Sequence, residues 1–188
     1  ICLCGSRIYV EKSLYEQFKT DFVERVKKLK VGDPADPASN LGAVVSKVHY
    51  EKVLGCIALA RQEGGTVLCG GEALHLPGAL AGGYYIAPTI IEGLPTQCRT
   101  NQEEIFGPVV TIWPFDTEEE AITYANGTMY GLAASLHTSD LKRAHRVAAA
   151  LETGIVWVNS WLVRDLRTPF GGMKASGIGR EGGMEALH

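Results

Sequence analysis

The sequence lacks the features that identify several classes of protein. Its 188 residues contain no uninterrupted run of about 18 apolar residues, the length that a membrane-spanning helix needs. The five cysteines show no paired CxxC spacing and the five histidines are scattered, so no metal site is predicted. We therefore expect a protein that neither enters a membrane nor binds a metal ion.

An excess of charge of one sign is also missing. The 18 Lys and Arg against 21 Asp and Glu give a net charge of −3, which offers no general attraction to nucleic acid or to an anionic membrane surface. Hydrophobic residues make up 46% and charged residues 21%, the balance of a soluble globular domain. An odd number of cysteines argues against a disulfide framework, and free thiols predict a reducing compartment, so we expect a cytoplasmic location.

Apolar periodicity and helix-capping signals predict helices that alternate with strands. The first predicted helix begins at Ser13 and carries an apolar stripe from Leu14 to Leu29, and the others cover 46–63, 118–126 and 139–151. The predicted strands cover 66–69, 109–115, 132–137 and 155–158, with a further extended run at 84–91. Because such alternation favours parallel strands, we expect an α/β fold: a layered domain with a mostly parallel sheet flanked by helices, and a glycine-rich tail outside it.

Two of the predicted helices begin with the spacing of a capping box. In this motif a Ser or Thr at the N-cap and a Glu three residues later satisfy N–H groups that the first helical turn leaves free. Ser13 with Glu16 has this spacing, and Thr117 with Glu120 has it again. Both pairs are therefore expected to fix where their helices start.

Three separated segments carry motifs that point to one family. The first, ICLCGSR at 1–7, places a cysteine five residues before an arginine; the others are EEIFGP at 103–108 and PFGGMKASG at 169–177. A lone cysteine or a lone GGxK would be weak evidence, but three motifs in this order are far more specific. Together they resemble the NAD(P)-dependent aldehyde dehydrogenases, and the resemblance covers nearly the whole chain.

The resemblance has implications for domain organisation. It identifies residues 1–188 with the catalytic domain of that family, truncated so that it begins at the nucleophile segment. The dinucleotide-binding domain, the glutamate that serves as general base and the oxyanion-hole asparagine are then expected upstream of this chain. The 188-residue fragment alone is accordingly expected to be inactive, and the full-length form to be a homo-oligomer.

The resemblance places the catalytic nucleophile at Cys2, five residues before Arg7, and leaves Cys4 without a role. An aldehyde carbon needs a soft nucleophile that later departs as a thiolate, and a cysteine does both. The implied reaction forms a thiohemiacetal on Cys2, passes a hydride to NAD to leave a thioester, and ends in hydrolysis. For a cysteine without the two distant motifs, a small buried residue would be the better interpretation.

The resemblance also identifies two residues for the cofactor. Glu104, the second acid of EEIFGP, matches the glutamate whose carboxylate accepts hydrogen bonds from the hydroxyls of the nicotinamide ribose. Phe106 matches its aromatic companion, which supplies a flat apolar surface beside that ribose. In an unrelated protein the same letters would instead describe a solvated acid and a core phenylalanine.

The expected substrate depends on Arg164, at a position where many members of the family have an aromatic residue. A permanently charged, bidentate donor in an aldehyde pocket suits a substrate with a carboxylate at its far end. The run WLVRDLRTPFGGMKASGIGRE from Trp161 is most similar to the 2-aminomuconic and 2-hydroxymuconic semialdehyde dehydrogenases, so a muconic-type semialdehyde is expected, with Trp161 also in contact with it. The alternative for Arg164 is an ion pair with Asp165 or another acid, and this alternative is stronger for Arg167.

Two other classes of function stay open from the sequence. A cysteine-dependent acyl-transfer or hydrolytic enzyme could use Cys2 without nicotinamide, but it would need a paired base, and no histidine is placed by a motif to serve as one. A noncatalytic interaction module derived from a truncated dehydrogenase is the second.

Overall fold

The computed structural model describes residues 2–187, and the chain divides into two compact units. One unit is Ser6–Phe115, and the other is Asp116–His188 together with Ile1–Gly5. Among the described residues, none of the helices combines the length and the apolar character that crossing a bilayer requires.

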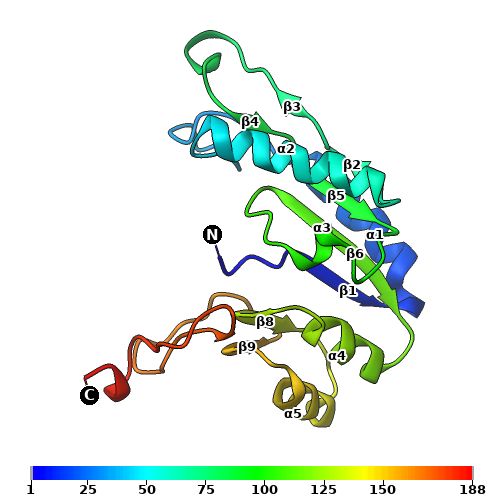
Figure 1. Ribbon diagram of the computed structural model, residues 1–188, viewed down its shortest axis with the longest axis vertical. Coiled ribbons are helices and arrows are strands. Elements are labelled where there is room, and N and C mark those ends of the chain that lie inside the picture. The colour runs from blue at the N-terminus through cyan, green and yellow to red at the C-terminus, as the bar shows by residue number, and fades with distance from the viewer. Residues whose placement is uncertain (1, 188) are drawn as a thin grey trace. The chain divides into compact units, whose positions relative to one another are not determined.

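A four-stranded sheet of order β1-β6-β5-β2 forms the centre of the unit Ser6–Phe115 (Figure 1). Its neighbours β1 and β6 are parallel, as are β5 and β6, whereas β2 is antiparallel to β5. A separate antiparallel ribbon is formed by β3 and β4. The bounds of these strands are β1 Arg7–Glu11, β2 Thr66–Cys69, β3 Ala73–Leu74, β4 Tyr85–Ile86, β5 Thr89–Glu92 and β6 Val109–Phe115.

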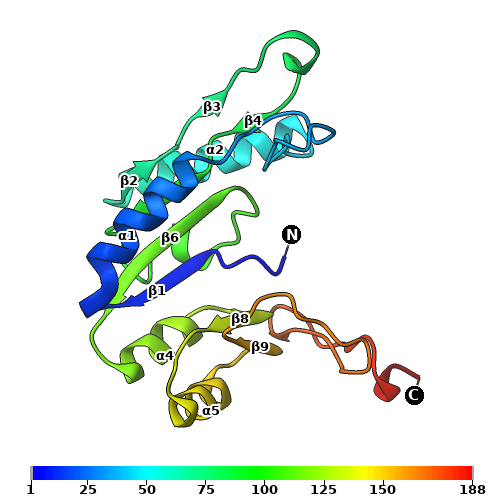
Figure 2. The same cartoon turned by 180° about the vertical axis from the view of Figure 1, so that it is seen from behind.

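Helices α1 (Lys12–Lys27) and α2 (Lys47–Gln62) cover opposite faces of this sheet, as the two views of the ribbon show (Figures 1 and 2). Adjacent residues of β5 mark the two cores. Ile90 packs on the side of α1 and Ile91 on the side of α2, and both are fully buried. Because successive side chains of a strand point to opposite faces, both of these adjacent positions in a strand between two helical layers are apolar. The short helices of this unit are η1 (Gly78–Leu80) and α3 (Arg99–Gln102).

The second unit is built on a parallel pair of strands, β8 (Ala133–Leu136) and β9 (Ile155–Val158). Helix α5 connects them and packs on β9, as expected for a parallel pair, which a short hairpin turn cannot join. A second pair, which is antiparallel, is formed by β7 and β10; β7 precedes β8 in the sequence and β10 follows β9. The remaining bounds are α4 Glu118–Asn126, β7 Tyr130–Gly131, α5 Leu141–Ala150, β10 Met173–Lys174 and η2 Met184–Leu187.

Most of the predicted elements are confirmed. The helices at 46–63 and 118–126 and the strands at 66–69, 109–115 and 155–158 are present to within one or two residues, in a layered, mostly parallel α/β arrangement. The capping box at Thr117 is formed: its hydroxyl accepts from the N–H of Glu120, and the Glu120 carboxylate accepts from the N–H of Asp116.

The predicted capping box at Ser13 is wrong. Helix α1 begins at Lys12, the N-cap residue is Glu11, and the Ser13 hydroxyl donates to the Glu11 carboxylate at 3.0 Å. Strand β1 ends at Glu11, and α1 begins at the next residue, Lys12. No loop separates them, so Ser13 lies inside the first turn of the helix and not at its N-cap.

The extended run predicted at 84–91 is divided, and the tail is not outside the fold. Pro88 separates β4 from β5, because proline has no N–H to donate to a strand ladder. In the glycine-rich tail, Lys174 of β10 pairs with Tyr130 of β7. Strands β1 and β10 were missed because their pairing partners lie far away in sequence.

The buried position of Ile91 gives a test of this architecture. We expect Ile91→Ala to lower the free energy of unfolding by about 2–5 kcal/mol, because the cavity under α2 cannot fully collapse. Leu14→Ala, at a residue that is 60% exposed, should change it by less than about 0.5 kcal/mol. Urea unfolding measures both, and equal losses would contradict the assigned core.

Candidate active site

The five free cysteines differ in their exposure to solvent. Cys2 and Cys4 are exposed, whereas Cys56, Cys69 and Cys98 are partly buried. Burial raises the pKa of these three thiols. Since the thiolate is the nucleophilic form, the partly buried cysteines are poor nucleophiles at neutral pH, and Cys2 and Cys4 remain as candidates. The possibility that Cys2 is a small buried residue is thereby removed.

Trp161 is attached to the segment that carries Cys2. Its indole N–H donates to the carbonyl of Leu3 at 3.1 Å, and its side chain is 47% exposed. Trp161, a predicted substrate residue, is thus bonded to Leu3, which directly follows the predicted nucleophile Cys2. Part of Trp161 remains exposed to a ligand.

The loop after β9 is held by side-chain hydrogen bonds that fix where Trp161 lies. The Asn159 amide pairs with both backbone groups of Thr138, at 2.8 and 2.9 Å, and Ser135 donates to the carbonyl of Ser160. Asn159 and Leu162 have left-handed backbone conformations, with φ of 53° and 58°. Such conformations are costly for residues other than glycine, so this loop is shaped by its contacts rather than by local preference.

Arg164 lies three residues beyond Trp161 and contacts two side chains of the tail. The Nη2 nitrogen of Arg164 forms an ion pair with Glu181, and the guanidinium carbon lies 4.4 Å from the centre of the Phe170 ring. An acid partner for Arg164 is therefore present, but it is Glu181 and not Asp165. Arg167 makes the expected pair with Asp165, and this arginine lowers the pKa of the aspartate carboxyl.

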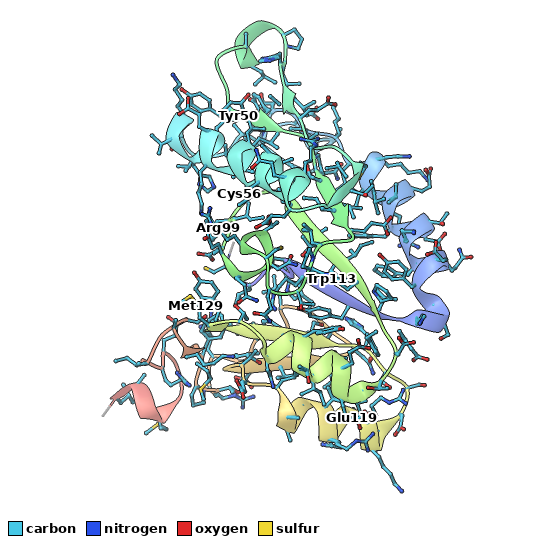
Figure 3. The ribbon with its side chains drawn as sticks, turned by 45° about the vertical axis from the view of Figure 1, so that its right-hand side comes forward. Tyr50, Cys56, Arg99, Trp113, Glu119 and Met129 are labelled. Carbon is cyan, nitrogen blue, oxygen red and sulfur yellow. The ribbon has the colours of Figure 1, made fainter. Side chains whose placement is uncertain are left out.

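The two adjacent acids of the 103–108 segment have different environments. Arg99, at the start of α3, binds Glu103 through two hydrogen bonds of 2.7 and 3.1 Å and lowers the pKa of its carboxyl. Figure 3 shows Arg99 close to Cys56 of α2. The Glu104 side chain is exposed, and its carboxylate makes no hydrogen bond to any other residue within 2–187. Of the two acids, Glu104 is the one available to a ligand.

Helix α2 fixes the backbone at Glu104 and at Phe106, two residues beyond it. Lys52 donates to the carbonyl of Glu104, and the Nε2 of His49 lies within hydrogen-bond distance of the carbonyl of Phe106, both at 2.7 Å. Phe106 has a φ of 57°, and the residue is 49% exposed. At Gly107 a side chain would collide with Val53, since a Cβ atom would come within 2.7 Å of it. Phe106 is thus not a core residue, and the segment lies directly on α2.

Several of these supporting residues could not be predicted from the sequence. His49 and Lys52 hold backbone atoms more than 50 positions away, and Glu181 reaches Arg164 across 17 positions. Only the spacing of His49 and Lys52, three apart on one helix face, is a local signal, and it does not name a partner.

Within residues 2–187 no group of three His, Cys, Asp or Glu side chains is arranged to hold a metal ion.

The predicted site residues fall in both units. Cys2, Trp161 and Arg164 belong to the unit that contains β8 and β9, whereas Glu104 and Phe106 belong to the unit of the four-stranded sheet. Each group contains side chains that are exposed and supported by surrounding contacts, as a ligand-binding residue requires.

Comparison with known proteins agrees with these features. The chain is 53% identical over its whole length to a 2-aminomuconic semialdehyde dehydrogenase of Danio rerio and 50% identical to a 2-hydroxymuconic semialdehyde dehydrogenase of Pseudomonas sp. strain CF600. It spans 39% and 38% of the lengths of these relatives. The crystal structure of betaine aldehyde dehydrogenase from Staphylococcus aureus in complex with NAD+ matches all of this chain, and 37% of its own, with a TM-score of 0.93 and 40% identity.

A model of the aldehyde dehydrogenase family matches residues 1–188, the full extent of the sequence. The chain therefore belongs to the aldehyde dehydrogenase family.

Proposed function

We propose that this chain is the catalytic domain of an NAD-dependent dehydrogenase that oxidises a carboxylate-bearing, muconic-type semialdehyde to the acid. The observation that carries the proposal is the exposed Cys2, with Trp161 bonded to the neighbouring residue, in a chain about half identical to muconic semialdehyde dehydrogenases. We expect the longer protein to contain a dinucleotide-binding domain and to be a cytoplasmic homo-oligomer. Neither an acyl-transfer enzyme without nicotinamide nor a noncatalytic module is favoured by these relatives.

Cys2 supplies the covalent step. Its sulfur adds to the aldehyde carbon, the carbonyl oxygen takes up a proton or is held as an oxyanion, and a thiohemiacetal results. Loss of a hydride from that carbon leaves a thioester. Water then attacks the thioester, the carbon–sulfur bond breaks, and the thiolate of Cys2 is regenerated together with the acid. The exposure of Cys2 supports this role, since both the aldehyde and the water must reach the sulfur.

Glu104 and Phe106 have the properties that a nicotinamide cofactor needs. The Glu104 carboxylate is exposed and has free acceptor positions for ribose hydroxyls, and Phe106 is exposed and offers an aromatic ring to stack beside a sugar. A bound NAD would supply the acceptor for the hydride that the thiohemiacetal loses. The contacts from His49 and Lys52 hold both residues before any ligand arrives, which reduces the entropy lost on binding.

Arg164 and Trp161 are assigned to the substrate. Arg164 is 38% exposed and offers a planar set of donors that matches a carboxylate, and Trp161 offers an apolar face. A conjugated semialdehyde with a terminal carboxylate presents both features, an apolar chain and an anion at its end.

The role of Cys2 can be separated from that of Cys4. In the full-length enzyme we expect Cys2→Ser to abolish dehydrogenase activity, because an alkoxide is hard to form and leaves poorly, while Cys4→Ser retains much of the activity. The steady-state rate of NADH formation measures both. Comparable losses from the two substitutions would show that the nucleophile is wrongly assigned.

The role of Glu104 has a matched control in its neighbour. Glu104→Gln should slow hydride transfer more than it weakens NAD binding, because the carboxylate that orients the ribose is lost. Glu103→Gln, which removes the acid bound by Arg99, should leave hydride transfer nearly unchanged. Rapid-mixing measurement of the NADH burst tests this, and an unchanged burst rate in Glu104→Gln would refute the assignment.

The role of Arg164 is tested by substrate charge. We expect Arg164→Ala to lower kcat/KM for a carboxylate-bearing semialdehyde by about 1.5–3 kcal/mol, the range of a hydrogen bond to a charged group, with little effect on an uncharged aldehyde. Arg167→Ala is the control, because that arginine is bound to Asp165 and 90% exposed. Equal losses for both aldehydes in Arg164→Ala would mean that the arginine is structural.

A further inference from the structure

Two tail residues that face each other across a backbone bridge hold Arg164. The N–H of Phe170 donates to the carbonyl of Glu181 at 2.8 Å, and the N–H of Glu181 donates back to the carbonyl of Phe170 at 2.7 Å. Residues directly opposite in such an antiparallel pair project their side chains to the same side. The Phe170 ring meets the face of the guanidinium, and the Glu181 carboxylate meets its Nη2 edge.

The guanidinium keeps donors to spare in this arrangement. Arginine has five N–H donors, and within residues 2–187 the carboxylate of Glu181 is the one group that accepts a hydrogen bond from Arg164. The Nε and Nη1 groups make no hydrogen bond within these residues, so they can donate to a second carboxylate. Arg164 is 38% exposed, so such a ligand can approach from solvent.

Glu181 also changes the charge that this ligand meets. An arriving carboxylate encounters a neutral pair instead of a lone positive charge, and it is repelled by the carboxylate already present. Because Glu181 is 66% exposed, the pair is screened by water and weak, and it can loosen without a large penalty. The stacked Phe170 ring is uncharged, so it supports the guanidinium whether or not Glu181 stays bound.

We propose that Glu181 is the counterion that limits the attraction of Arg164 for anionic ligands, and that Phe170 is a positioning residue for the same guanidinium. This inference rests on the proposed function, because it assumes that Arg164 binds the substrate carboxylate. Oxidation turns the aldehyde into a second carboxylate, so the product carries one more negative charge than the substrate. A neutralised Arg164 binds the substrate less tightly but also releases the dianionic product more readily.

The test compares variants of the full-length enzyme at low ionic strength, with 4-oxobutanoate as the carboxylate-bearing aldehyde, butanal as the uncharged one and succinate as a competitive inhibitor. Glu181→Gln keeps a hydrogen-bond acceptor but removes the charge, so the KM for 4-oxobutanoate and the inhibition constant of succinate should both fall about fivefold. Phe170→Leu should raise both about fivefold. The KM for butanal should stay unchanged in each variant.

A matched control removes a different acid of the same unit. Glu152 pairs with Lys174 and does not touch Arg164, so Glu152→Gln should leave all three constants unchanged. The gain in Glu181→Gln should also shrink at high salt, because screening weakens the attraction of the freed guanidinium. Thermal unfolding checks that each variant is folded.

The outcomes separate this inference from the function on which it rests. A wild-type enzyme that does not prefer 4-oxobutanoate to butanal would overturn the proposed substrate class. If that preference holds but succinate inhibits Glu181→Gln no better than wild type, the counterion role is wrong. If Phe170→Leu shifts butanal and 4-oxobutanoate equally, the ring has only a general structural role.

Discussion

The packing of α2 against the sheet is the interaction on which the proposed cofactor residues depend. Val53 and Ile57 of α2 are fully buried, and this burial fixes the helix over β5 and β6. Gly107 then lies directly on Val53, where no side chain would fit. Just before Gly107, Lys52 donates to the carbonyl of Glu104, and His49 contacts the carbonyl of Phe106. The exposed acid Glu104 is thereby attached to the core through its own backbone. A change that weakened the packing of α2 would therefore displace Glu104, although Glu104 itself would be unchanged.

The elements of the fold could be predicted where the sequence signal is local, and the predictions failed where it is not. Helix α2 and strand β9 were predicted because a capping serine and an unbroken apolar run mark them within their own segments. Strand β1 was missed because only its parallel pairing with β6, about a hundred residues away, makes it a strand. At Ser13 the capping-box spacing predicted the wrong first residue for α1. Strand β1 continues to Glu11, which is therefore the N-cap residue.

The site shows the same division. Cys2, Glu104 and Phe106 could be named from motifs, because chemistry dictates residue type at a fixed spacing. Their support could not be: the bonds from His49 to Phe106 and from Glu181 to Arg164 join segments that only the folded chain brings together. A motif thus identifies which side chain acts, and long-range contacts determine where it points.

In two places a local partner decides which of two similar charges is left for a ligand. Arg99, at the start of α3, binds Glu103, the residue directly after that short helix, and leaves Glu104 open. Asp165 binds Arg167 in the same way and leaves Arg164 to the tail. Because a partnered charge must give up its partner before it can bind a ligand, the charge that is left without this local partner binds at lower cost. For Glu104 the selection is complete among the described residues, whereas Arg164 keeps Glu181 as a weak, exchangeable partner that can adjust its affinity.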